Sequence, residues 1–153
     1  MQLRWVCEGA LTTGNGTMVG VLARLFYLTG NDAYRERAEA IATAFSGELE
    51  RNFFPLATLI NGNEILQRAL QVVIRGTRED PATLALLRAA HGISLPNLVL
   101  ATVAPGAALP QSHPAAGKAM IGGKPTAYVC EGPVCSLPIT DAAALAEDLR
   151  QRR

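Results

Sequence analysis

Residues 71–103 read QVVIRGTREDPATLALLRAAHGISLPNLVLATV, and they decide the fold of the C-terminal half of the chain. The stretch opens with residues 71–74 and closes with residues 98–103, two short apolar runs rich in β-branched side chains. Continuous runs of this kind are typical of strands that are buried on both faces. A segment with helical spacing lies between them. Strand, helix and strand in this order predict a βαβ unit with two parallel strands and a right-handed crossover.

The helix of this unit carries its own start and stop signals. Asp80 can accept a hydrogen bond from a free backbone N–H of the first turn, and Pro81 suits the first helical position. Leu84 and Leu87 continue one apolar face, and residues 91–92 (His-Gly) close the helix.

The turn before this helix, residues 76–80 (GTRED), is a candidate phosphate site. A strand, a glycine and a helix start form a geometry in which backbone N–H groups can hold a phosphate. The turn has a single glycine and lacks the lysine of a P-loop, and Asp80 already occupies the cap position. We therefore interpret these residues as a capped strand-to-helix turn.

The remaining C-terminal residues predict a further β unit and a helix. Residues 104–114 are rich in Gly, Pro and Ala and are typical of a loop. Residues 126–130 predict a third strand, and residues 134–137 its partner or an irregular extension, with Gly132-Pro133 suited to the turn between them. Residues 141–151 predict the final helix.

The first half of the chain has the period of helices. One apolar face recurs at helical spacing in a first helix: Met18, Val21, Leu22 and Leu25, widened by Val19 and Phe26. A second helix carries a stripe that we expect to be buried against the first: Tyr34, Ala38, Ile41, Ala42, Phe45 and Leu49. Thr29-Gly30-Asn31 between them predicts an antiparallel helical hairpin, with Gly30 in the left-handed conformation.

A third helix is predicted to begin near Phe54-Pro55, because proline is tolerated in the first turn of a helix. Its apolar face is supplied by Leu56, Leu59 and Ile60. Asn61-Gly62-Asn63 either breaks this helix or lies within it.

The whole chain reads as α+β, with a helical segment over residues 1–68 and a small α/β unit over residues 69–153. Its 153 residues are 49% hydrophobic and 18% charged, which is typical of a globular protein.

A net charge of +1 with scattered basic residues argues against nucleic-acid binding. No apolar run approaches the roughly 20 residues that cross a bilayer. The absence of a secretory signal and the odd number of cysteines lead us to expect a reducing, cytoplasmic location.

Cys130 and Cys135 are the candidate redox residues. The turn at residues 131–134 can bring the two sulfur atoms together across a narrow hairpin, so a redox pair is sterically possible. The spacing is not C-x-x-C, and no helix N-terminus follows Cys130 to stabilise a thiolate. We expect both residues to be structural thiols, with Cys130 facing inward on its strand.

Glu8 and Glu64 are the candidate catalytic carboxylates. General acid–base catalysis requires groups that converge within hydrogen-bond reach, and the sequence alone does not show such convergence. A zinc site at the two cysteines of the hairpin would have to add ligands at irregular spacings: Cys7, His91 or His113. We therefore expect no metal and no cofactor.

Several motifs follow one another in a characteristic order. They are Glu8-Gly9-Ala10, Gly14-Asn15, Leu28-Thr29-Gly30-Asn31, residues 71–76, Leu95-Pro96-Asn97, and Ala127-Tyr128-Val129-Cys130 with Cys135, Pro138 and Thr140-Asp141. In this order they resemble a family of thioredoxin-like-domain proteins that includes the spermatogenesis-associated proteins and their bacterial relatives. The resemblance covers nearly the whole chain. One departure is Gly16, where the pattern of the family has serine.

The resemblance implies a large parent architecture. Members of the family carry an N-terminal thioredoxin-like domain, then an (α/α)6 toroid of six helical hairpins, as in sugar epimerases and glycosidases, and a terminal α/β appendage. This chain resembles only the end of the toroid and the appendage. The thioredoxin-like redox motif has no counterpart in these residues, so Cys130 and Cys135 do not inherit its role.

Three functions follow as hypotheses. The leading one is a noncatalytic C-terminal segment that closes a six-hairpin toroid and packs against the remainder of a larger parent protein, or against itself, through an exposed apolar face. The second is part of a carbohydrate-active enzyme that uses Glu8 or Glu64 on a carbohydrate ligand. The third is a thiol redox or metal-binding module that uses Cys130 and Cys135.

Overall fold

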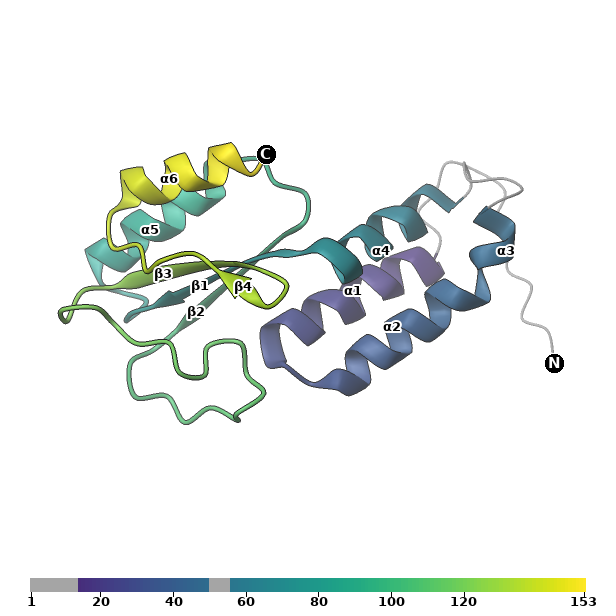
Figure 1. Cartoon of the computed structure of the whole chain (residues 1–153), viewed down its shortest axis with the longest axis horizontal. Coiled ribbons are helices and arrows are strands. Elements are labelled where there is room, and N and C mark those ends of the chain that lie inside the picture. Colours follow the sequence, from purple (N-terminus) through teal and green to yellow (C-terminus); the bar gives the residue numbers. More distant parts are fainter. Residues whose placement is uncertain (1–13, 50–55) are drawn as a thin grey trace. The chain divides into compact units, whose positions relative to one another are not determined.

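The computed structural model of the protein describes residues 14–49 and 56–153 (Figure 1). These residues form two compact units. The helical unit contains residues 14–26, 31–49 and 56–67, and the sheet unit contains Tyr27–Gly30 and Arg68–Arg153. The fold is a mixture of helices and a four-stranded sheet, so the predicted α+β class is confirmed.

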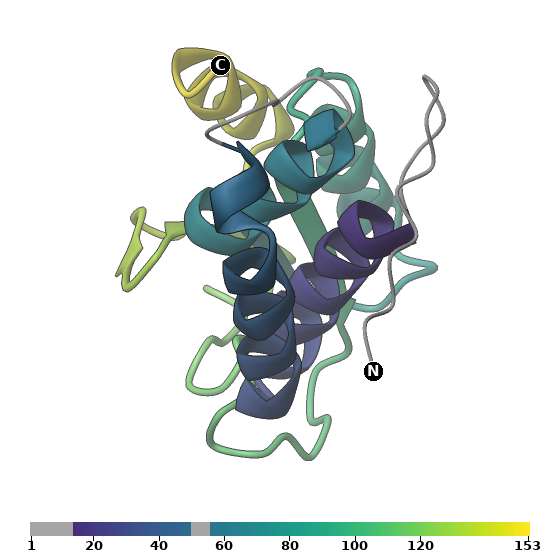
Figure 2. The same cartoon turned by 90° about the vertical axis from the view of Figure 1, so that its right-hand side faces the viewer.

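The helical unit begins with the predicted hairpin. Helix α1 spans Gly14–Thr29 and α2 spans Asp32–Ala44, and the two lie side by side in both views (Figure 1, Figure 2). Gly30 has φ +69°, which an L side chain rarely adopts. Asn31 caps α2, because its side-chain oxygen accepts a hydrogen bond from the Ala33 backbone N–H at 3.1 Å. The hairpin is therefore confirmed down to its turn chemistry.

Two more helices complete the described part of this unit: α3, Ser46–Leu49, and α4, Ala57–Arg68. Helix α4 runs without a break through Asn61-Gly62-Asn63, so the polar triplet lies within the helix. Phe54-Pro55, the predicted helix start, lies outside the described residues.

Gly62 has a packing role that explains why it is tolerated in the middle of a helix. A Cβ atom added there would lie 2.8 Å from the Gly16 carbonyl oxygen and 2.9 Å from the Gly20 backbone nitrogen, both on α1. A Cβ added to Gly16 would lie 2.5 Å from the backbone nitrogen of Leu59 on α4. The two helix backbones therefore approach each other through glycines on both sides.

The predicted stripe is divided between two helices and is only partly covered, because α2 ends at Ala44, Phe45 is its C-cap, and Leu49 lies in α3. Ala38 is fully buried, whereas Tyr34, Ile41 and Phe45 are half-buried. The side chain of Leu49 lies outside the described part of the chain. The expectation of a fully buried face on α2 is therefore wrong: its central alanine is enclosed, and the larger side chains around it keep part of their surface exposed.

The sheet unit contains the predicted βαβ element. Strand β1 (Leu70–Arg75) pairs in parallel with β2 (Leu98–Val103), and helix α5 (Pro81–His91) connects them. Strand β3 (Thr126–Glu131) pairs antiparallel with the other edge of β1, and β4 (Val134–Cys135) pairs antiparallel with β3. The strand order is β2-β1-β3-β4, and helix α6 (Ala142–Gln151) follows the sheet.

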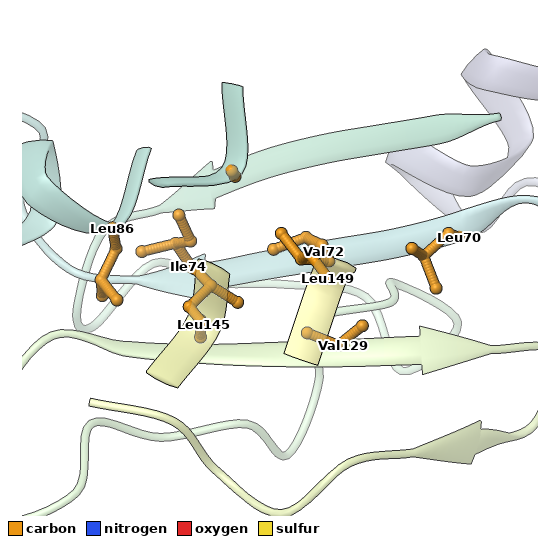
Figure 3. Packing of buried hydrophobic residues seen from close by; sticks show 9 residues of the cluster. Leu70, Val72, Ile74, Leu86, Val129, Leu145 and Leu149 are labelled. Atoms are coloured by element: carbon orange, nitrogen blue, oxygen red, sulfur yellow. The ribbon is translucent and has the colours of Figure 1, made fainter. Parts of the chain in front are cut away.

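One face of the sheet packs against α5 and α6 and forms the hydrophobic core (Figure 1, Figure 3). Val72 and Ile74 of β1 are fully buried there between Val129 of β3 and the two helices. The helices add their own apolar side chains, including Leu86 of α5 and Leu145 of α6. Because successive strand residues point to opposite faces, this assigns the even-numbered residues of β1 to the core.

The other face of the sheet lies against residues 104–125, which we call the cover segment (Figure 1). Val73 points to this face by alternation and is 0% exposed, so the face is covered. Tyr128 of β3 connects the cover segment to the sheet by two hydrogen bonds. Its hydroxyl donates one to the Ala119 carbonyl oxygen at 2.7 Å and accepts one from the Ala119 N–H at 3.3 Å. Ala115 of the segment is itself 1% exposed. The predicted loop therefore serves as the second layer over the sheet.

Candidate functional site

Cys130 and Cys135 form a disulfide bond, with an Sγ–Sγ distance of 2.12 Å. They are directly opposite each other in the β3–β4 pairing, where cross-strand side chains lie side by side. Gly132 in the intervening turn has φ +57°, which allows the tight reversal. The prediction of two separate thiols is therefore wrong, because the hairpin register holds the sulfur atoms within bonding distance.

The two halves of this disulfide have different environments. Cys130 is 3% exposed, which confirms that it faces inward, and it lies on the same face as Tyr128. Cys135 is exposed. A reductant can therefore approach the bond from the β4 side, while the β3 side remains covered.

The predicted carboxylates do not form a described acid–base pair. Glu8 lies outside the described residues. Glu64 is exposed on α4. Asp80 is engaged in capping α5, because its carboxylate accepts a hydrogen bond from the Ala82 N–H at 2.8 Å. Within the described ranges, no hydrogen bond or ion pair connects Glu64 to another candidate catalytic side chain.

The strand-to-helix turn at residues 76–80 is a capped turn, as interpreted from the sequence. Pro81 occupies the first turn of α5 behind the Asp80 cap. Gly76 is required for close packing, because a Cβ there would collide with the Thr83 hydroxyl oxygen and would lie 3.1 Å from Cβ of Pro125. The Thr83 hydroxyl is fully buried and has no hydrogen-bond partner among the described residues.

A cationic cluster between the sheet and the cover segment is not evident from the sequence. Arg75, the last residue of β1, is 8% exposed, and its Nε and Nη1 atoms have no hydrogen-bond partner among the described residues. The cover segment adds two half-buried side chains to this cluster, the imidazole of His113 and the ammonium group of Lys118. We call Arg75, His113 and Lys118 the Arg75 cluster.

The electrostatics of the cluster follow from this placement. Burial, and then the positive charges of Arg75 and Lys118, lower the pKa of His113. Burial also lowers the pKa of Lys118. The ion pairs found among the described residues all involve other side chains, so no carboxylate there neutralises the cluster. No local sequence signal could have revealed this site, because a strand end and a distant loop meet only in the fold.

Within residues 14–49 and 56–153, no group of three or more His, Cys, Asp or Glu side chains could hold a metal ion. His91 is exposed at the end of α5, and Cys7 lies outside the described residues. None of the helices in the described ranges combines the length and the apolar composition that a bilayer-spanning helix needs.

The chain is similar to stretches of larger proteins. No model of a protein family matches the chain, and no solved structure matches it. Spermatogenesis-associated protein 20 of Homo sapiens is 32% identical over 142 residues, which are 90% of this chain and 18% of the human protein. The protein of the same name from Rattus norvegicus is 32% identical over 148 residues, 94% of this chain and 19% of the rat protein. The Mus musculus protein is 31% identical over the same length. The chain is thus a distant relative of a stretch of spermatogenesis-associated protein 20, and it spans less than one fifth of the length of the relatives it matches.

Proposed function

We propose that this chain is a noncatalytic docking segment, whose helical unit completes a larger helical body of the toroid type and packs against it through α1. In this proposal the sheet unit is an appendage of that body. The segment contributes surface and stability, and any chemistry belongs to the body that it completes.

The observation that carries the proposal is the distribution of apolar residues around α1. One side of this helix is buried inside the described structure and includes Val19, Leu22 and Ala23. A second apolar stripe, at i, i+3 and i+7, contains Met18, Val21 and Leu25. Met18 is 49% exposed and Val21 is 47% exposed. An exposed apolar stripe beside an already buried side of the same helix favours a further partner.

The relatives support the identity of that partner. They match this chain over only 18–19% of their own length, so most of their sequence has no counterpart here. The family resemblance implies that this remaining part contains helical hairpins, which pack through apolar stripes like the one on α1. The proposed partner is therefore the helical body that corresponds to the unmatched part of the relatives.

Complex formation tests the proposal directly. The tagged chain is co-expressed with the human relative from which the 142 matching residues have been deleted. We expect a complex of one copy of each, measured by light scattering after size-exclusion chromatography. The deleted human segment, supplied as a separate chain, is the positive control.

Variants of the stripe identify the surface involved. Met18→Gln with Val21→Gln should abolish the complex, since polar groups would be buried without partners. Arg37→Gln, on the exposed side of α2, is the matched control and should leave the complex intact. The proposal fails if the human segment assembles and this chain does not. It also fails if the chain pairs with itself through the stripe and ignores the human body.

A further inference from the structure

We propose that the Arg75 cluster is a binding site for a small oxyanion, such as phosphate or sulfate or the phosphate group of a larger ligand. The site lies at the carboxyl end of β1, between the sheet and the cover segment. It lies entirely within the sheet unit and is independent of the docking surface on α1.

Arg75 is a buried cation with no counterion among the residues that the structure describes. A charge removed from water is costly unless it is paired and hydrogen-bonded. The residue is only 8% exposed, and its Nε and Nη1 donate to no described atom. Each of these two groups forms, together with Nη2, one of the two forks of the planar guanidinium that match two oxygen atoms of a phosphate or carboxylate. A bound oxyanion would neutralise the charge and accept a hydrogen bond from one of these two donors.

His113 supplies a further donor. Its Nδ1 accepts a hydrogen bond from the Ala115 N–H at 3.0 Å. In the neutral imidazole the proton is therefore on Nε2, which is a donor. The Ala115 contact thus fixes a tautomer whose second nitrogen can donate to an anion.

Lys118 supplies a second charge from the same segment. Its Nζ donates to the Pro114 carbonyl oxygen at 2.6 Å and lies 5.9 Å from the centre of the Tyr128 ring. An ammonium group has three N–H donors, so the Pro114 contact leaves two for a ligand. The hydroxyl of Tyr128 is occupied by Ala119 and holds the segment against the sheet. The cluster thus contains cations from both β1 and the cover segment, and Tyr128 of β3 holds the cover segment in place.

The charge balance at the site selects the class of ligand. An arginine, a lysine and a histidine lie together, and no described carboxylate is paired with them. A cation would be repelled, and a neutral molecule would leave the buried charge of Arg75 uncompensated. Because Nε and Nη1 are shielded from water, the ligand reaches them by displacing part of residues 113–118.

The two histidines of the chain provide a test with an internal control. The imidazole ring signals of His113 and His91 are followed by NMR as a function of pH on the complete chain, in sodium sulfate and in sodium chloride of equal ionic strength. Sulfate keeps its charge across this pH range. The anion should raise the pKa of His113 in a saturable way, because it offsets Arg75 and Lys118 and favours the imidazolium. The ring signals of His91, which is exposed on α5, should be the same in both salts.

Variants connect this response to the cluster. Lys118→Gln should weaken sulfate binding by about tenfold or more, as expected for losing a hydrogen bond to a charged group. Lys124→Gln removes an exposed lysine of the same segment and should leave binding unchanged. Arg75→Gln should abolish sulfate binding. If this variant does not fold, the comparison of Lys118→Gln with Lys124→Gln still tests the proposal. Equal responses of His113 and His91 would overturn the proposal, as would equal losses in the two lysine variants, which would indicate screening by an adventitious ion only.

Discussion

Gly16→Ala should destabilise the helical unit, although alanine is normally the better helix former. The added Cβ would lie 2.5 Å from the backbone nitrogen of Leu59, 2.7 Å from the Thr58 carbonyl carbon and 2.9 Å from the Thr58 Cβ. Two of these atoms are backbone atoms of α4, which cannot rotate away as a side chain could. The substitution therefore forces α1 and α4 apart.

The magnitude is a balance of two terms. Overpacking a close contact costs about 1–3 kcal/mol, and contact with backbone places this case at the upper end. Replacing glycine by alanine in a helix interior stabilises by about 1 kcal/mol. The net loss for Gly16→Ala is therefore about 2 kcal/mol. Gly62→Ala should behave in the same way, with its Cβ at 2.8 Å from the Gly16 carbonyl oxygen.

The assay is urea denaturation of the complete chain, followed by far-ultraviolet circular dichroism. Gly20→Ala is the matched control on the same helix, because its Cβ would lie 3.7 Å from Cα of Gly62, an ordinary contact distance. It should be neutral or stabilising. The glycine-contact reasoning is refuted if Gly16→Ala and Gly20→Ala unfold at the same urea concentration, or if Gly16→Ala is the more stable of the two.

Further predictions concern the partly covered helix, the disulfide and the response to pH. Phe45→Ala should cost about 1–2 kcal/mol by thermal denaturation, less than the roughly 3–5 kcal/mol of a fully enclosed phenylalanine, because Phe45 is half-buried; a loss above about 3 kcal/mol would contradict this. Because the bond occupies Cys130 and Cys135, thiol titration of the unfolded, unreduced chain should find one of the three cysteines. Reduction should lower the free energy of unfolding by about 2 kcal/mol, as expected for a short loop; three free thiols before reduction would contradict the bond. The pKa of His113 is lowered in the folded chain, so below about pH 6.5 the unfolded chain binds more protons than the folded chain does. The free energy of unfolding should therefore decline as pH falls, until His113 of the folded chain also becomes protonated. His113→Gln should flatten this decline; a slope that survives it would assign the effect to another group.

The elements best predicted from the sequence are those specified by neighbouring residues. The Asp80 cap with Pro81 behind it, and the Gly30 turn, each depend on chemistry within a few positions, and the structure places all of them as expected. The parallel pairing of residues 70–75 with 98–103 also follows from local signals, because a strand–helix–strand sequence leaves few alternatives.

The features that the sequence did not predict depend on contacts between distant residues. Gly62 has the local signature of a helix breaker, and only the approach of α1 shows why a glycine is required within α4. Arg75 ends an apolar strand, and its relation to His113 and Lys118 exists only after the cover segment folds back. The turn predicts a hairpin that can hold a disulfide, but it does not predict the bond itself. The strand register sets the distance between the two sulfur atoms, whereas the expectation of free thiols is based on the expected compartment.

The proposed docking of α1 is tested most directly by the chemical accessibility of position 21 in the complex with the truncated human relative. Val21→Cys is introduced into a Cys7→Ser background, and its rate of alkylation is measured in the isolated chain and in the complex. Val21 is 47% exposed, so the engineered thiol should react readily when the chain is alone. In the complex we predict that the rate falls well below that of the isolated chain, because the core of an interface is packed as densely as a protein interior and excludes the reagent. An unchanged rate in a complex that has formed would contradict the account, because the apolar stripe of α1 would then face solvent and not the partner.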